Sequence, residues 1–142
     1  MKTNIEQLSS ITKTAQMGQI GIRCVLDRAQ NQDLKNALNS QLNEYDMIEA
    51  EAKKLANQKG WEIEGINPGV KSMSKAYTKA CLMMGNVDSR IAAMMINGNT
   101  RGMIKSIKNQ HHAKEHDSQV DALAEKLLLY ETNNIKQMQA FL

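Results

Sequence analysis

Residue types that favour β-strands or interrupt helices are scarce in this sequence. Aromatic side chains make up 4% of its 142 residues, and Pro68 is its only proline. Strands prefer aromatic and β-branched side chains, so a core that depends on leucine, isoleucine, alanine and ten methionines is typical of helices. The length is that of one ordinary domain. We therefore expect an all-α protein with a single domain over residues 1–142.

The sequence also lacks the patterns that mark secreted proteins, membrane proteins and several classes of enzyme. Cys24 and Cys81 are isolated, which indicates two free thiols and no disulfide. There is no signal-peptide pattern and no apolar run long enough to span a bilayer, so we expect a cytoplasmic protein with no membrane partner. A nucleophile-elbow serine, a glycine-rich phosphate loop and a dinucleotide fingerprint are all missing. These absences favour a protein that is not an enzyme and needs no cofactor.

The formal net charge of +3 is small, and lysine and arginine alternate with acidic residues along the chain. A nucleic-acid interface would need a clustered basic stripe. Six lysines could form one only if they converged on a single face, namely Lys53, Lys54, Lys71, Lys75, Lys105 and Lys108. We interpret the basic side chains as a solvated surface and expect no nucleic-acid partner.

Apolar side chains recur every three or four residues through long stretches, the pattern of helices that bury one face. The first stretch runs from Thr3 to about Gln30, and the second from Asp33 to Lys59, where Gly60 ends it. The buried faces should contain Leu8, Ile11, Ala15, Gly18, Ile22, Val25 and Ala29 in the first helix, and Leu34, Leu38, Gln41, Tyr45, Ile48, Ala52 and Leu55 in the second.

The second half of the chain begins with residues 60–69, which hold three glycines and the only proline and are predicted to form a loop. A shorter helix is expected over 70–84, and a long one from a cap at Asp88 or Ser89 to about Lys108. The last helix should bury Val120, Leu123, Leu127, Tyr130, Asn134, Gln137 and Phe141. Two helical hairpins joined by a longer crossover make a ferritin-like four-helix bundle, here with a short extra helix in the crossover.

Five segments, in this order along the chain, carry a resemblance to a known family: MGQIGIRCVLDRAQNQDLKNAL, EYDMIEAEAKKLANQKG, MSKAYTKACLMMGN, DSRIAAMMINGNTRG and LAEKLLLYETNNIKQMQAFL. Together they cover nearly the whole sequence. Their order and patterns resemble the DUF2383 family of bacterial ferritin-like proteins of unknown function. The resemblance implies a ferritin-like bundle without an assigned activity.

Di-iron proteins of the ferritin-like type take a lone glutamate from each of two helices and a Glu-x-x-His pair from each of the other two. Residues three apart share a helix face and can bind one ion together. The first helix of this sequence has no acid between Glu6 and Asp27. The other three offer Glu44 with Met47, Asn97 with Asn99, and Glu131 with Asn134. Two of the four acids and both histidines are therefore missing.

Two glutamates with amides would bind iron or manganese weakly, because amides carry no charge. We interpret these positions as a polar layer inside the bundle, where hydrogen bonds fix the helix register. Its expected members are Gln41, Glu44, Tyr45, Asn97, Asn99, Glu131 and Asn134. Gly98 and Gly102 would let a neighbouring helix approach closely. A di-metal carboxylate site that uses Glu44 and Glu131 is the alternative interpretation.

His112 and His116 are a second metal candidate, because histidines four residues apart on a helix can chelate zinc, nickel or copper. Their polar surroundings make them weak candidates. A third feature is a set of methionines that we interpret mainly as core filling, namely Met83, Met84, Met94, Met95 and Met103. An outward-facing methionine of each pair, together with Cys81 or Ile104, would form an apolar patch fit for a second subunit.

Taken together, these patterns predict a non-enzymatic helical bundle that acts as a binding or structural module. We expect it to form a homo-oligomer of two or more copies and to have room for a further protein partner, which the sequence does not identify. The alternative function, from another class, is a di-iron or di-manganese carboxylate protein that handles iron or catalyses an oxidation.

Overall fold

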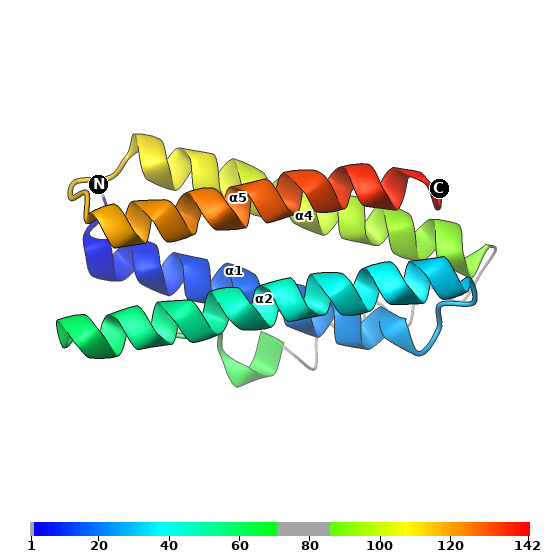
Figure 1. Ribbon diagram of the computed structural model, residues 1–142, viewed down its shortest axis with the longest axis horizontal. Helices are drawn as coiled ribbons and strands as arrows, with labels where there is room; N and C mark the ends of the chain where they lie inside the picture. Colours follow the sequence, from blue (N-terminus) through cyan, green and yellow to red (C-terminus); the bar gives the residue numbers. More distant parts are fainter. Residues whose placement is uncertain (1, 71–85) are drawn as a thin grey trace.

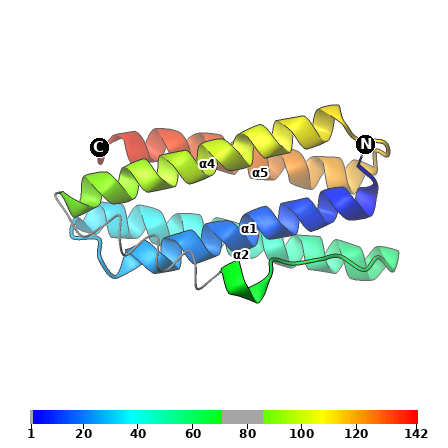
Figure 2. The ribbon, with the colours of Figure 1, turned by 180° about the vertical axis from the view of Figure 1, so that it is seen from behind.

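Helices account for most of the computed structural model, which describes residues 2–70 and 86–142. Four long helices, α1 (Asn4–Leu26), α2 (Gln32–Lys59), α4 (Val87–His111) and α5 (Ser118–Gln139), run side by side. Figures 1 and 2 show two hairpins, α1 with α2 and α4 with α5, packed face to face. Apart from one isolated bridge between Lys2 and Ala113, the described residues contain no β-structure. The predicted all-α class is confirmed.

Side chains at the helix ends satisfy backbone groups that have no partner within the helix. α1 begins with a capping box, in which the Thr3 and Glu6 side chains accept each other's N–H groups at 3.2 and 2.9 Å. At the end of α2, Gly60 adopts the left-handed conformation with a φ of 69°. A residue with a side chain rarely takes this conformation, so the predicted stop at Gly60 is confirmed.

Other predicted boundaries were wrong. α1 ends at Leu26 and does not continue to Gln30, while α4 extends to His111, beyond its predicted end. The cap of α4 is Asn86, whose side chain accepts a hydrogen bond from the Ser89 N–H at 3.2 Å. The apolar pattern identifies the helices, but the caps depend on polar side chains that lie outside it.

Contacts at both ends of the bundle set the direction of α4 relative to the first hairpin. Asp88, at the start of α4, accepts hydrogen bonds from the N–H groups of Gln30 (2.8 Å) and Asn31 (2.9 Å), in the turn between α1 and α2. At the opposite end, the Lys2 N–H donates to the His112 carbonyl at 2.9 Å. α4 therefore runs antiparallel to α1 and parallel to α2 (Figure 1). One long crossover of this kind is the connection found in ferritin-like bundles.

The first part of the crossover, residues 60–70, lies along α1 (Figure 2). Its backbone is fixed by side chains of that helix. The Glu64 N–H donates to Ser9 Oγ at 3.0 Å, and the Ile66 N–H donates to Gln16 Oε1 at 2.9 Å. These bonds give the loop a defined path although it has no regular structure.

The loop ends slightly earlier than the sequence predicts. The Asn67 side chain accepts the Gly69 N–H at 2.9 Å, and a helical turn starts at Pro68. This turn is where the short helix expected over 70–84 would begin. Apart from Val70, that helix lies outside the described residues.

The core combines the inward faces of all four helices. Every leucine, isoleucine, valine, alanine and tyrosine predicted for the buried faces of the first two helices is buried, while Gly18 is half-buried. In α5 the inward stripe shifts by one residue, so that Glu131 and Met138 replace the predicted Tyr130 and Gln137. A straight helix repeats every 3.6 residues, and an apolar pattern read in steps of three and four drifts against it.

Asp88 offers a direct test of the link between the hairpins. Replacing it with alanine should lower the free energy of unfolding by about 1–3 kcal/mol, because two backbone N–H groups lose a charged acceptor. The control is Glu125→Ala, at an exposed position of α5, which should change stability by less than about 0.5 kcal/mol. Urea unfolding followed by circular dichroism measures both variants. Equal stabilities would contradict the role assigned to Asp88.

Candidate functional site

A layer of buried polar side chains crosses the interior of the bundle. It consists of Gln41 and Tyr45 from α2, Asn99 from α4, and Glu131 and Asn134 from α5. None of these five side chains is more than 3% exposed. We call these five residues the polar layer. All five were predicted members of a buried polar layer, and the structure places each of them inside the bundle.

Tyr45 connects three helices within the polar layer. Its hydroxyl donates a hydrogen bond of 2.6 Å to Asn99 Oδ1, and Asn99 Nδ2 donates to the Met95 carbonyl at 2.8 Å. On the other side its ring lies against Gly18 of α1, where a Cβ atom would overlap the ring. Burial raises the pKa of Tyr45 far above its usual range, and nearby carboxyl groups, including Glu131, raise it further. Tyr45 is therefore a neutral hydrogen-bonding group.

Glu131 is buried without a hydrogen-bond partner among the described residues. Its carboxyl group lies against Gly102 of α4, where the Cβ atom of any other residue would overlap it. Burial raises the pKa of Glu131 to about 8, although the charge of Lys105 acts in the opposite direction. The folded protein therefore holds Glu131 mainly as a neutral carboxylic acid at pH 7.

Two amides of the polar layer are also incompletely paired. Gln41 Nε2 donates to Gln137 Oε1 at 2.9 Å. Gln41 Oε1 and Asn134 Nδ2 have no partner within hydrogen-bond distance among the described residues, although Asn134 lies near enough to the Tyr45 hydroxyl to act against the rise of its pKa. An unpaired buried polar atom lowers the free energy of unfolding by about 1–3 kcal/mol, so the surrounding apolar core must offset the cost of burying the layer. Such atoms are rare in native cores and indicate a role beyond filling space.

The structure does not bring two of the predicted members into the layer. Asn97 is exposed, so its predicted place in the core was wrong, because Asn99 takes the inward position on α4 instead. Glu44 is half-buried, and burial raises its pKa. It lies close enough to Tyr45 for its charge to raise the pKa of the phenol. Glu44 therefore sits at the border of the layer.

His112 and His116 do not form the predicted helical pair, because α4 ends at His111. The carbonyl of His112 accepts the Lys2 N–H, so this segment ties the start of the chain to the bundle. His116 Nδ1 lies 3.3 Å from an oxygen of Asp121. Both imidazoles are exposed and are held by separate contacts.

The polar layer does not supply the ligands of a di-metal centre. Within residues 2–70 and 86–142, no cluster of three or more histidine, cysteine, aspartate or glutamate side chains could hold an ion. In the same residues Glu131 is the only fully buried acid, while Glu44 is half-buried. The remaining side chains of the layer are amides and a phenol, which carry no charge for a hard cation. The residues present do not fit a di-metal group.

A second polar cluster joins α1 to α2 and was missing from the sequence prediction. Glu49 accepts hydrogen bonds from Gln16 (2.6 Å) and Gln19 (3.1 Å) and pairs with Lys53 at 3.1 Å. Burial acts to raise the pKa of Glu49, but these contacts outweigh it and lower the pKa. The available signal was the spacing of Gln16 and Gln19, which puts two amides on one side of the apolar stripe.

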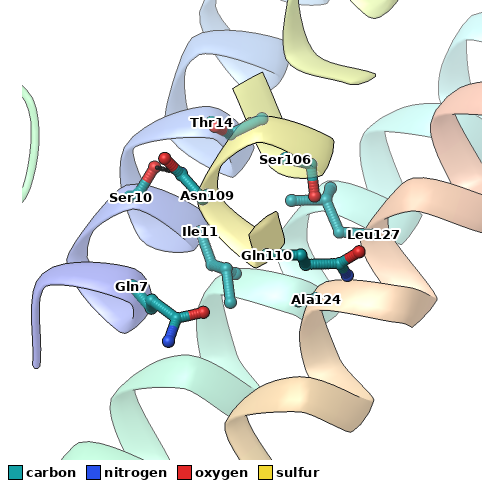
Figure 3. Close-up of a pocket in the computed structure, with 9 residues that line it drawn as sticks. All are labelled: Gln7, Ser10, Ile11, Thr14, Ser106, Asn109, Gln110, Ala124 and Leu127. Atoms are coloured by element: carbon teal, nitrogen blue, oxygen red, sulfur yellow. Dashed lines mark hydrogen bonds between the residues drawn. The ribbon is translucent and has the colours of Figure 1, made fainter. Parts of the chain in front are cut away.

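A small cavity lies between α1, α4 and α5 (Figure 3). Its volume is about 10 Å³, which is room for about one water molecule. Asn109 of α4 donates a hydrogen bond of 2.8 Å to Ser10 Oγ of α1 beside it. This cavity is far below the size of a small-molecule site, so it is a place for solvent and not for an organic substrate.

The predicted surface features divide between the two sides of the bundle. Lys53 and Lys54 belong to α2, and Lys105 and Lys108 belong to α4, which lies diagonally across the bundle (Figure 1). These four lysines do not share a face, and the other two considered lie outside the described residues.

Among the helices that the structure describes, none is long and apolar enough to cross a membrane.

The methionines agree in part with a core-filling role. Met95 is 7% exposed, and Met94 packs against the core as a half-buried side chain. Met103 is half-buried and lies 3.8 Å, through its sulfur, from the Thr132 hydroxyl. Cys24 is a free thiol of intermediate exposure. The predictions for Met83, Met84 and Cys81 lie outside the described residues.

The fold and the polar layer define a helical bundle of the four-helix class, and solved structures share this arrangement. A DUF305 fragment from Deinococcus radiodurans superposes with a TM-score of 0.76 at 12% identity, covering 96% of this chain and 93% of that chain. YcfI from Rhodopseudomonas palustris, for which a structural role has been proposed, gives a TM-score of 0.65 at 16% identity, covering 96% and 90%. No protein-family model and no curated protein matches the sequence. At these identities the similarity establishes the fold alone.

Glu131 should make stability decrease as the pH rises. Its pKa is about 8 in the folded protein against an ordinary value of 4.5, so the folded state keeps a proton that the unfolded chain loses between these values. Its contribution to the free energy of unfolding is therefore fully present below pH 4.5 and falls by up to about 5 kcal/mol toward pH 8. Glu131→Gln keeps the shape without titrating, so it should remove this fall when urea unfolding is followed across the range. Parallel pH profiles for the two proteins would refute the buried neutral acid.

Two glycines of α4 should respond in opposite ways to alanine. Gly98 is exposed with open space around its Cβ position, so its predicted role in a close helix approach was wrong, and Gly98→Ala should add about 0.5–1 kcal/mol of stability. Gly102→Ala puts a methyl group into the Glu131 carboxyl and should cost about 1–3 kcal/mol. Urea unfolding measures both changes. A stabilising effect of Gly102→Ala would show that the contact with Glu131 is unimportant.

Proposed function

We propose that this chain is a non-enzymatic, ferritin-like helical bundle, resembling the DUF2383 proteins, that acts as a binding or structural module. In this proposal the polar layer occupies the place of a di-metal site that the chain has lost. The observation that carries it is the state of Glu131, a buried acid that keeps its proton and lies against Gly102. The structural role proposed for YcfI, which has a similar fold, agrees with this function.

The charge of the layer supports the loss of the metal site. A pair of divalent cations would bring several positive charges into a region with a single fully buried acid among the described residues. To bind them, Glu131 would first have to lose its proton, which costs about 1.4 kcal/mol for each pH unit below its pKa. Tyr45, Asn99 and Asn134 would add only uncharged groups. A module held together by neutral hydrogen bonds fits these residues better than a redox centre.

We further propose that a second copy of the chain covers the outer face of α4 and α5. Ile104 and Ile107 of α4 and Leu129 of α5 are 47%, 36% and 58% exposed. Met103 contacts Thr132 between the two helices, so Ile104 and Leu129, which are one and three residues away along the chain, lie at a similar height along the bundle. Apolar side chains exposed near one another favour association with another surface. The net charge of +3 is too small to oppose pairing of two copies.

Metal content tests the first part of the proposal. Protein purified without an affinity tag and then incubated with ferrous iron should hold far less than one iron or manganese ion per chain by elemental analysis, because the layer lacks charged ligands. Near-stoichiometric metal that is lost in Glu131→Gln would contradict the proposal and favour the carboxylate alternative with Glu44.

Light scattering tests the second part. The mass should be at least twice the 15.9 kDa of one chain, and Leu129→Lys should shift it to that of the monomer, because burying a lysine charge in an apolar interface is unfavourable. Met47→Lys is the matched control, since Met47 is 50% exposed on α2, away from the proposed face. A monomer before any substitution, or equal loss of assembly in both variants, would exclude the proposed interface.

A further inference from the structure

A pocket on the outside of α1 is separate from the polar layer and from the small cavity of Figure 3, apart from the shared Ser10. Its volume is about 310 Å³, near the lower end of the range for small-molecule sites. α1 and the residue before its cap contribute most of its lining, the crossover contributes Glu62 and Glu64, and α4 contributes Lys105. A compact ligand would therefore contact three segments that are distant in sequence.

Three lysines, Lys2, Lys13 and Lys105, line this pocket. Burial lowers the pKa of Lys105, and the charges of Lys2 and Lys13 lower it further, so both ammonium groups are close enough to repel that of Lys105. Among the described residues, Lys2 and Lys105 form no ion pair, while Lys13 pairs with Glu64 at 3.4 Å. The pocket thus holds positive charge that is only partly compensated.

The acids of the pocket compensate Lys2 and Lys13 more than they compensate Lys105. A backbone N–H of the α1 cap, accepted at 2.9 Å, and the charge of Lys2 both lower the pKa of Glu6, so this ionised acid partly compensates Lys2, while Glu64 pairs with Lys13. Glu62 is exposed to solvent. None of the three is among the charges that shift the pKa of Lys105. Two lysines lower it, and Glu131, which lies inside the bundle, acts in the opposite direction. The end of the pocket near Lys105 is therefore its positive end.

Two buried hydroxyl groups also line the pocket. Ser9 and Ser10 are 7% and 6% exposed. Ser9 Oγ accepts a hydrogen bond from the Glu64 N–H at 3.0 Å. Ser10 Oγ accepts one from the side-chain amide of Asn109 at 2.8 Å, and Figure 3 shows these two side chains next to each other. In the part of the chain that the structure describes, neither hydroxyl donates a hydrogen bond, although Thr12 of the same helix donates to a backbone carbonyl. Both O–H groups are free to bind an acceptor in the pocket.

We propose that this pocket binds a phosphate group, either inorganic phosphate or the monoester of a small molecule. Lys2, Lys13 and Lys105 would neutralise the phosphate charge, and Ser9 and Ser10 would donate to its oxygens. A phosphate carries up to two negative charges and several acceptor oxygens, so it meets both unmet requirements at once, the repelling ammonium groups and the free hydroxyls. Phosphate binding goes beyond the binding or structural role proposed above, and its site is linked to the polar layer only through the electrostatic interaction between Lys105 and Glu131.

Isothermal titration calorimetry with inorganic phosphate and with glycerol phosphate, at constant ionic strength set by chloride, tests the site. Lys105→Gln should weaken binding about tenfold or more, because a charged donor is lost from the site. Ser10→Ala should weaken binding by a smaller factor. The matched control is Lys136→Gln, at an exposed lysine of α5 outside the pocket, which should bind like the unmodified protein. Circular dichroism verifies that each variant is folded.

Saturable binding of either compound that Lys105→Gln weakens and Lys136→Gln preserves would support the proposal. The compound that binds more tightly would identify the source of the phosphate group. Absence of saturable binding for both compounds would overturn it. So would an equal loss in Lys105→Gln and Lys136→Gln, because this would indicate a general effect of net charge.

Discussion

The contact between the Glu131 carboxyl and the Gly102 backbone is the constraint on which the interior of this protein depends. Because Gly102 has no side chain, α5 can direct an acid into the core against α4. Burial then keeps the proton on Glu131, and a neutral carboxyl can lie beside the Tyr45 phenol without a charge that would need a partner. A charged group in the same place would require a cation or a base. The neutral state of the layer follows from this one contact.

The two hairpins use the same device. In the first, Gly18 of α1 makes room for the ring of Tyr45 from α2, and in the second, Gly102 of α4 makes room for Glu131 from α5. Each hairpin thus pairs a glycine with a large polar side chain of its own partner helix. Tyr45 then joins the hairpins through Asn99. A polar connection between two apolar faces fixes one register, since a shift along the helix would leave its groups unpaired.

The sequence predicts much of this fold, and the reasons for its failures are specific. Apolar periodicity identifies the buried faces of α1 and α2 because every turn there repeats the same spacing. Apolar periodicity fails for Asn97. Asn97 and Asn99 lie on different sides of α4, and the two glycines beside them weaken the apolar pattern that would show which side is buried. Apolar periodicity identifies Gly102 as a site of close approach, but the contacting group is a side chain and not a helix backbone.

Contacts between distant residues were the least predictable part of the structure. The bond from Asp88 to the turn after α1 and the gathering of Lys2, Lys13 and Lys105 depend on how the hairpins pack. No local pattern marks either of them. Five of the seven residues predicted for the polar layer are buried in it. These five lie on the inward face of a long helix, where the spacing along the sequence is enough to tell which side chains point into the bundle.

The protonation state of Glu131 is the most direct test of this account. Carbon-13 spectra of protein labelled at the glutamate side-chain carboxyl carbon report each acid as the pH is raised. The account predicts one signal that is still protonated at neutral pH, titrates near pH 8 and disappears in Glu131→Gln. If the signal lost in that variant titrates near the ordinary value of 4.5, Glu131 is ionised in the folded protein and the neutral polar layer is wrong.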